Sequence, residues 1–186
     1  MDVKMPIKAK PYKHQKEAFN FVLNTFQKLN GAALLAEMGT GKSFISVAVA
    51  GALYKAEKTR KLLIVCPLSI CGVWEEEFKK FADFEYDLQI LKGTSDKKAS
   101  ALRHMYGDKL QVAVVNYESV WRLENSVKRW GPDFIICDES HKIKSHNIAA
   151  SKSLHRLGAI SRYKLTLTGT VITNKAIDVF SQYKFL

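Results

Sequence analysis

The chain has 186 residues, of which 47% are hydrophobic and 25% charged, as in an ordinary globular domain with a buried core. Neither a signal peptide nor an apolar stretch long enough to cross a bilayer is present, so we expect neither a secreted nor a membrane-spanning protein. Lys and Arg number 29 against 18 Asp and Glu, and the resulting net charge of +11 predicts a polyanionic partner, most often nucleic acid. A basic protein without such a partner is the alternative.

Helical and strand patterns alternate along the chain. In order, the sequence predicts a helix over 14–29, a strand over 32–35, a helix over 42–56, a strand over 61–66, a helix over 70–81, a strand over 87–91, a helix over 96–106, a strand over 111–115, a short helix within 117–129, a strand over 133–137, a helix over 147–157, a strand over 163–168 and a helix over 175–185. The first helix has one apolar face: Phe19, Val22, Leu23, Phe26 and Leu29. Ser95 or Asp96 is a candidate helix cap.

Strands that are separated by helical crossovers predict an α/β fold, with a mostly parallel central sheet and helices on both faces. We expect a single domain over 1–186. The three cysteines, Cys66, Cys71 and Cys137, lack the spacing of a metal site. They predict reduced, mostly buried thiols of an intracellular protein. The expected localisation is the cytoplasm of a prokaryotic or viral host, or a nucleus.

Residues 36–43, AEMGTGKS, lie between a predicted strand and a predicted helix, as in a phosphate-binding loop. Backbone N–H groups and the positive end of the helix stabilise polyphosphate there. Lys42 would contact the β- and γ-phosphates, and the hydroxyl of Ser43 would bind Mg²⁺. The strict pattern begins with Gly, where this chain has Ala36. The expected nucleotide-binding residues of the loop are Met38, Gly39, Thr40, Gly41, Lys42 and Ser43.

A second motif follows the strand predicted over 133–137, where Asp138 and Glu139 stand side by side. Asp138 would hold Mg²⁺ and Glu139 would polarise the attacking water, so these two and Lys42 are the expected catalytic residues. Because ligands bind at the carboxyl ends of parallel strands, we expect Lys42 and Asp138 to face each other at one edge of the sheet.

The DESH sequence at 138–141 resembles the DEAH-type box of superfamily 2 helicases. From about residue 12 to 186, the chain resembles the first RecA-like lobe of the Swi/Snf family of double-stranded DNA translocases. The similar segments are KPYKHQKE at 10–17, LAEMGTGKS at 35–43, LIVCPLSICGVWEEEFKKF at 63–81, VVNYE at 114–118, DESHKIK at 138–144 and LTLTGTVITN at 165–174. The resemblance implies a RecA-like phosphate-loop ATPase that uses ATP and Mg²⁺ and acts on double-stranded DNA.

The resemblance also implies residue roles. Gln15 would recognise adenine. Coupling between the ATP state and DNA contact would use His141, Thr168, Gly169 and Thr170. DNA contacts would come from Pro67, Ser69, Asn116 and Tyr117. Trp74, Trp121 and Trp130 are expected to pack in or near the core.

Three positions depart from the family pattern: Val171 replaces a Pro, Asn116 a Thr, and Ser140 an Ala or Gly. The second RecA-like lobe, with its arginine finger, is not found in these 186 residues, so we expect the isolated chain to bind ATP and hydrolyse it slowly. The alternatives are a nucleotide- and DNA-binding module without turnover and a restriction-type superfamily 2 helicase. A small-molecule kinase would fit the phosphate loop but neither the Asp-Glu pair nor the basic charge.

Overall fold

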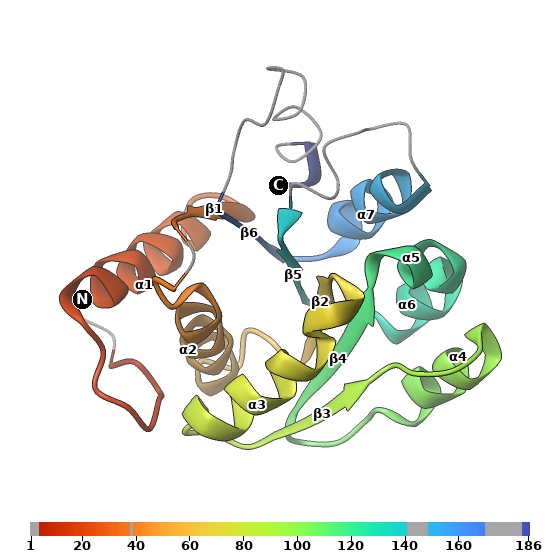
Figure 1. Ribbon diagram of the computed structural model, residues 1–186, viewed down its shortest axis with the longest axis horizontal. Coiled ribbons are helices and arrows are strands. Elements are labelled where there is room, and N and C mark those ends of the chain that lie inside the picture. Colours follow the sequence, from red (N-terminus) through yellow and green to blue (C-terminus); the bar gives the residue numbers. More distant parts are fainter. Residues whose placement is uncertain (1–3, 38, 141–148, 170–183) are drawn as a thin grey trace.

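The computed structural model describes residues 4–37, 39–140, 149–169 and 184–186. In these residues, six strands form one sheet in the order β1-β6-β5-β2-β4-β3, and every pair of neighbours is parallel (Figure 1). The strands are β1 (Gly31–Leu35), β2 (Lys61–Cys66), β3 (Tyr86–Ile90), β4 (Leu110–Asn116), β5 (Phe134–Asp138) and β6 (Tyr163–Thr168).

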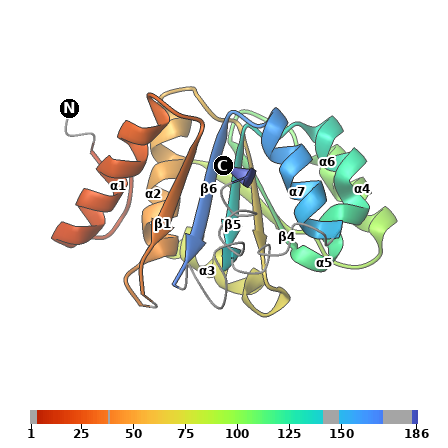
Figure 2. The same ribbon diagram turned by 90° about the horizontal axis from the view of Figure 1, so that it is seen from above.

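Helices cover both faces of the sheet. They are α1 (Lys13–Phe26), α2 (Lys42–Lys55), α3 (Cys71–Phe81), α4 (Ser95–His104), α5 (Tyr117–Val120), α6 (Glu124–Trp130) and α7 (Ala149–Ile160), with 3₁₀ turns η1 (Leu68–Ile70) and η2 (Trp121–Leu123). Figure 2 shows α1 and α2 on one side of the sheet and α4, α6 and α7 on the other. Among the helices that the structure describes, none combines the length and apolarity needed to cross a membrane.

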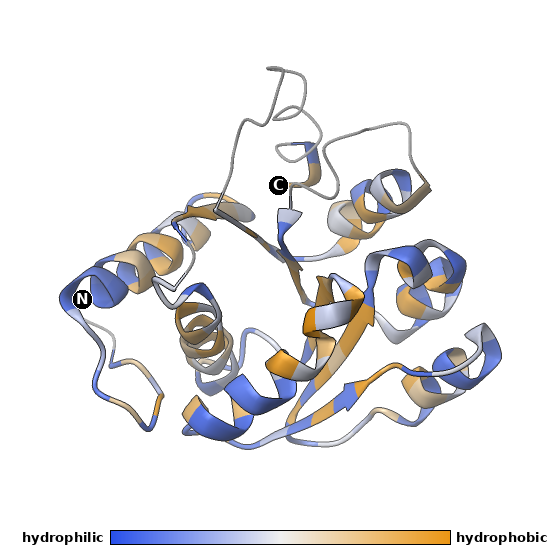
Figure 3. Ribbon diagram, viewed as in Figure 1, coloured by the Kyte–Doolittle hydropathy of each residue, from blue (hydrophilic) through white to orange (hydrophobic). Residues whose placement is uncertain are grey.

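The central strands are buried on both faces, which explains their nearly continuous apolar sequences. In β2, Leu62, Ile64 and Cys66 pack against α1–α3, whereas Leu63 and Val65 pack against α4–α7. This alternation follows from the two-residue period of a strand. Figure 3 shows the resulting concentration of hydrophobic residues in β2 and β4. The sheet therefore separates two hydrophobic cores.

The predicted strands and the helices before residue 161 are found in the structure, with α5, η2 and α6 in place of the one short helix expected within 117–129, and the bounds of β2 and β6 are confirmed to the residue. The apolar face of the first helix was predicted too long: α1 ends at Phe26, and the side chain of Leu29 is 63% exposed. The predicted cap of α4 was wrong, because Ser95 already belongs to the helix. Extended Thr94 precedes it and accepts from the backbone N–H of Lys97 at 3.4 Å.

The tryptophans divide into two groups. Trp74 and Trp130 are buried as predicted, and Trp121 is 42% exposed. The helix predicted over 175–185 lies almost wholly outside the described residues. Phe185 is described, and its buried ring packs against Gly158 of α7 in the core beside α4–α7.

Candidate functional site

The carboxyl ends of all six strands lie at one edge of the parallel sheet, and the predicted motifs meet there. The phosphate loop follows β1, Asp138 ends β5, and Thr168 ends β6, which lies between those two strands. The backbone N–H of Ala36 donates to the carbonyl of Thr168 at 3.2 Å. The loop that begins at Thr168, which is expected to couple the ATP state to DNA contact, therefore starts between the glycine-rich loop and the acidic pair.

A cleft of about 660 Å³ opens at this edge. Its lining comes from several elements: Ala9, Lys10, Tyr12, Gln15, Gly39, Gly41, Lys42, Ser43, Phe44, Ile70, Val73, Trp74, Glu77, Lys80, Phe81, Asp138 and Glu139. Lys42 and Asp138 face the same cleft, close enough for the ammonium charge to lower the pKa of the carboxyl. The expected meeting of the two motifs is thus confirmed.

The glycine-rich loop takes its shape from two left-handed residues, Gly39 (φ +81°) and Gly41 (φ +85°). Gly41 immediately precedes Lys42, the first residue of α2, so the positive end of that helix faces the cleft. The ammonium of Lys42 donates to the carbonyls of Ala36 (2.8 Å) and Glu37 (3.0 Å). The loop is thereby folded around a single cation, a geometry suited to an anionic ligand.

Gln15 connects α1 to this loop. Its side-chain carbonyl accepts from the backbone N–H of Tyr12 (3.0 Å), and its amide nitrogen donates to the carbonyl of Thr40 (3.4 Å). Tyr12 is 71% exposed and stacks on His14, whose ring lies 3.2 Å from the same Thr40 carbonyl. Recognition of adenine by Gln15 stays a prediction. What the structure shows is a residue that holds the loop.

Asp138 is a buried carboxylate that accepts two hydrogen bonds and lies near one positive charge, that of Lys42. Its Oδ1 accepts from the backbone N–H of Glu139 (2.9 Å), and its Oδ2 from the indole N–H of Trp74 (3.1 Å). Burial raises the pKa of Asp138 to about 6, although these hydrogen bonds and the charge of Lys42 lower it. Glu139 takes a left-handed conformation (φ +51°), which is strained for a residue with a Cβ and is typical of functional sites.

Two aromatic residues support Asp138 in ways that the sequence analysis missed. Trp74 was assigned only to packing, and Tyr117 only to a DNA contact. Both are buried, and the Tyr117 hydroxyl donates to the backbone carbonyl of Asp138 at 2.7 Å. A buried indole or phenol needs a hydrogen-bond partner, which was the available signal. Which group serves as that partner depends on the order of the strands in the sheet.

Comparison with known proteins identifies the family. The model of the SNF2-related domain matches residues 14–186, almost the whole chain. The chain belongs to the SNF2-related family. Its similarity to Swi/Snf ATPases, inferred from the motifs, is therefore confirmed.

Individual relatives of this SNF2-related domain are distant in sequence. It is 27% identical over 175 residues to the ISWI chromatin-remodeling complex ATPase ISW2 of Saccharomyces cerevisiae, an alignment that covers 93% of this chain and 15% of that protein. It is 29% identical over 174 residues to the mouse (Mus musculus) chromodomain-helicase-DNA-binding protein 1-like, covering 90% and 19%. The chain thus spans a small part of these relatives.

A solved structure extends the comparison to the fold. The Sulfolobus solfataricus SWI2/SNF2 ATPase core in complex with double-stranded DNA superposes with a TM-score of 0.84 at 27% identity, over 100% of this chain and 38% of that one. The predicted RecA-like phosphate-loop fold is confirmed, and the SNF2-related domain corresponds to about one lobe of the ATPase core.

The remaining predicted residues of the SNF2-related domain fall into two groups. Pro67 follows β2 directly, the exposed Ser69 lies in the 3₁₀ turn after it, and Asn116 is the last residue of β4. All three therefore lie at the edge of the sheet where the cleft opens. The Asn116 amide donates to Glu118 at 2.7 Å. Tyr117 is buried, and its hydroxyl is bonded to the carbonyl of Asp138, so its predicted contact with DNA stays a prediction. Thr168 is buried and Gly169 exposed, whereas Met38, His141, Thr170 and Val171 lie outside the described residues.

The SNF2-related family implies nucleotide use, for which Mg²⁺ is typical, and the cleft fits such a metal. The buried Asp138 carboxylate and the Ser43 hydroxyl line the same cleft. Both offer the hard oxygen donors that Mg²⁺ prefers.

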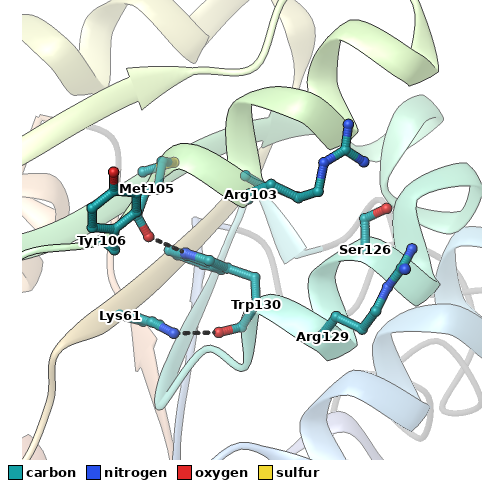
Figure 4. A pocket seen from close by; sticks show the side chains of 8 residues that line it. Lys61, Arg103, Met105, Tyr106, Ser126, Arg129 and Trp130 are labelled. Carbon is teal, nitrogen blue, oxygen red and sulfur yellow. Dashed lines mark hydrogen bonds between the residues drawn. The ribbon is translucent and has the colours of Figure 1, made fainter.

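A second cavity, of about 270 Å³, lies away from the cleft, where β2 begins (Figure 4). It is lined by Lys61, Leu102, Arg103, Met105, Tyr106, Ser126, Arg129 and Trp130. There the indole N–H of Trp130 donates to the Met105 carbonyl (3.1 Å), and Lys61 donates to the Trp130 carbonyl (2.7 Å). None of the expected nucleotide-site residues lines this cavity of the SNF2-related domain.

Proposed function

We propose that the chain is the ATP-binding lobe of a DNA-dependent ATPase that moves along double-stranded DNA. The observation that carries this proposal is the shared cleft, in which Lys42 and Ser43 from the start of α2 meet Asp138 and Glu139 from the end of β5. A cationic loop opposite two carboxylates is suited to a metal-bound polyphosphate. A small-molecule kinase fits neither this adjacent Asp-Glu pair nor the net charge of +11 as well.

In this proposal the loop N–H groups and Lys42 bind the β- and γ-phosphates. The ammonium would exchange its present partners, the carbonyls of Ala36 and Glu37, for phosphate oxygens. Ser43 and Asp138 would hold Mg²⁺, which supplies positive charge to the phosphates. Glu139 would accept a proton from the attacking water, and Trp74 would keep the Asp138 carboxylate oriented through its indole N–H.

We expect slow turnover from this chain alone. Among the described residues that line the cleft, the cations are Lys10, Lys42 and Lys80, and none is an arginine. An arginine finger is worth roughly 10³–10⁵ in rate, so a second lobe would have to supply it. The same observation favours the second candidate, a module that binds nucleotide and DNA without turnover.

Two observations support DNA as a partner: the positive net charge of the chain and its similarity to a protein whose structure contains DNA. The net charge of +11 favours a polyanion, and the similar Sulfolobus structure was solved with double-stranded DNA. Pro67, Ser69 and Asn116 would contact phosphates of one strand at the carboxyl edge of the sheet. Affinity should then fall steeply with rising salt, because counterions are released when phosphates are contacted.

Titration of the chain with a fluorescent ATP analogue, with and without Mg²⁺, tests nucleotide binding directly. Turnover is then measured with duplex DNA present, alone and with a second-lobe protein added. Stimulation only in the presence of that protein supports the ATPase, whereas binding without stimulation supports the module. DNA-stimulated turnover of about one per second from the chain alone would contradict the need for a second lobe. A DNA affinity that does not change with salt would contradict the phosphate contacts.

A further inference from the structure

Two thiols touch at the carboxyl end of β2. The Sγ atoms of Cys66 and Cys71 are 3.5 Å apart. Cys66 is the last residue of β2 and is fully buried, and Cys71 is the first residue of α3 and is 5% exposed. The short connection between them consists of Pro67 and the 3₁₀ turn η1. A thiol pair in contact, joined by so short a segment, needs only a small local movement to form a disulfide.

The sheet determines which cysteines can meet. Cys66 and Cys71 both belong to the core beside α1–α3, whereas Cys137 of β5 belongs to the core on the opposite face. The alternation of side chains along β2 and β5 produces this separation. Of the three pairings that the sequence allows, the structure therefore favours Cys66 with Cys71.

Cys71 can be reached by a small molecule. Its side chain lines a cavity of about 340 Å³ together with Leu68, Gly72, Lys98 and Asn116. The hydrogen bond that the two thiols share lowers the pKa of Cys71, burial raises it, and the charge of Lys98 lowers it. The same hydrogen bond and burial raise the pKa of Cys66. Because Cys71 borders this cavity and Cys66 is fully buried, Cys71 is the nucleophile and Cys66 the resolving thiol.

We propose that Cys66 and Cys71 form a redox-active dithiol that a small hydroperoxide converts to an intramolecular disulfide. The Cys71 thiolate attacks a peroxide oxygen of hydrogen peroxide, and the O–O bond breaks to give a sulfenic acid and, after protonation, water. The Cys66 sulfur then attacks the sulfenic sulfur, the S–S bond forms, and a second water leaves. In total the two thiols lose two protons and two electrons, and the peroxide is reduced to two waters.

The disulfide would act on the nucleotide cleft, a consequence that rests on the proposed function. A covalent bond is shorter than the 3.5 Å contact, so the first turn of α3 must move toward β2. That turn carries Val73 and Trp74, which line the cleft, and Trp74 donates to Asp138. Displacement of Trp74 would weaken the hydrogen bond that orients the Asp138 carboxylate, and the loss of one such bond corresponds to about tenfold weaker ATP binding.

Peptide mapping tests the disulfide on the full chain without any variant. Trypsin leaves Cys66 and Cys71 together on peptide 62–79 and Cys137 on peptide 130–142. After treatment of the reduced chain with hydrogen peroxide and alkylation in denaturant, peptide 62–79 should lose the mass of two hydrogens and resist alkylation, while Cys137 is alkylated. Cys71→Ser should abolish this product, and Cys137→Ser should leave it unchanged. Full alkylation of both cysteines, a link to Cys137, or a product formed only in denatured chain would overturn the proposal.

The link to the cleft is tested separately. The fluorescent ATP analogue is titrated into reduced, oxidised and re-reduced chain, and into peroxide-treated Cys71→Ser. Weaker binding of the oxidised chain alone, restored by a thiol reductant, supports the link. A disulfide that leaves the affinity unchanged overturns it. A reduced chain that binds no ATP contradicts the proposed function, but the disulfide is still judged by its mass.

Discussion

Gly41 and Gly39 offer a matched pair of substitutions in the nucleotide-binding loop. Both residues have nearly the same left-handed φ, +85° and +81°. Among the residues that the structure describes, a Cβ on Gly39 would meet nothing within 4 Å, whereas a Cβ on Gly41 would lie 2.5 Å from the amide nitrogen of Gln15. Alanine at the two positions therefore carries the same backbone cost, but only Gly41→Ala displaces a neighbour.

The expected magnitudes follow from these contacts. A residue with a Cβ pays roughly 1–2 kcal/mol in the left-handed region, and this is the whole expected cost of Gly39→Ala. Gly41→Ala also moves Gln15 from its hydrogen bonds with Tyr12 and Thr40, each worth about 1 kcal/mol. We expect Gly41→Ala to lower the free energy of unfolding by about 3–4 kcal/mol, and to weaken ATP binding because α1 no longer holds the loop.

Urea denaturation of the two single variants measures the difference between their free energies of unfolding, which should be about 2 kcal/mol. A double-mutant cycle with Gln15→Ala isolates its cause. In the Gln15→Ala background, Gly41→Ala should cost no more than Gly39→Ala, because the displaced side chain is gone. Equal losses for Gly39→Ala and Gly41→Ala, or full additivity in the cycle, would refute the role of Gln15 as the anchor of the loop.

Three further predictions concern other parts of the chain. Lys42→Ala should abolish binding of the ATP analogue while the circular dichroism spectrum stays that of the parent, and retained affinity would contradict the proposed site. Trp74→Phe should lower the free energy of unfolding by about 2 kcal/mol, since it removes the donor to Oδ2 of the buried Asp138 carboxylate, and should weaken Mg²⁺-dependent ATP binding; Trp130→Phe, which also loses an indole hydrogen bond, should affect stability alone. The hydrogen bonds from Arg156 lower the pKa of Glu124 from 4.5 to about 2, so the ion pair stabilises the fold above pH 4.5 and loses this effect as the pH falls toward 2. Glu124→Gln should therefore cost about 1 kcal/mol at pH 7 and progressively less below pH 4.5 in urea titrations, and a pH-independent difference would contradict this assignment.

Local patterns in the sequence were sufficient for the elements and for the chemistry of the two motifs. The basic residues at 60–61 and Pro67 bracket the apolar run of β2 and determine its bounds, because the run favours a strand buried on both faces and proline cannot donate a hydrogen bond to a neighbouring strand. The glycines and Lys42 before an apolar helix predict a phosphate loop, since this chemistry is contained in a few consecutive residues. Glycine was needed at position 41 for its φ, and that too was predictable.

The strand order and everything that depends on it were decided by the tertiary structure. Periodicity describes which face of an element is apolar, but it does not say which strand lies beside which. Trp74 and Asp138 are 64 residues apart and become hydrogen-bonded only because β2 and β5 are neighbours in the sheet. The separation of Cys137 from Cys66 and Cys71 likewise depends on the faces of that sheet. Contacts between distant residues follow from the packing of whole elements, and this packing is what positions the carboxylate opposite the phosphate loop.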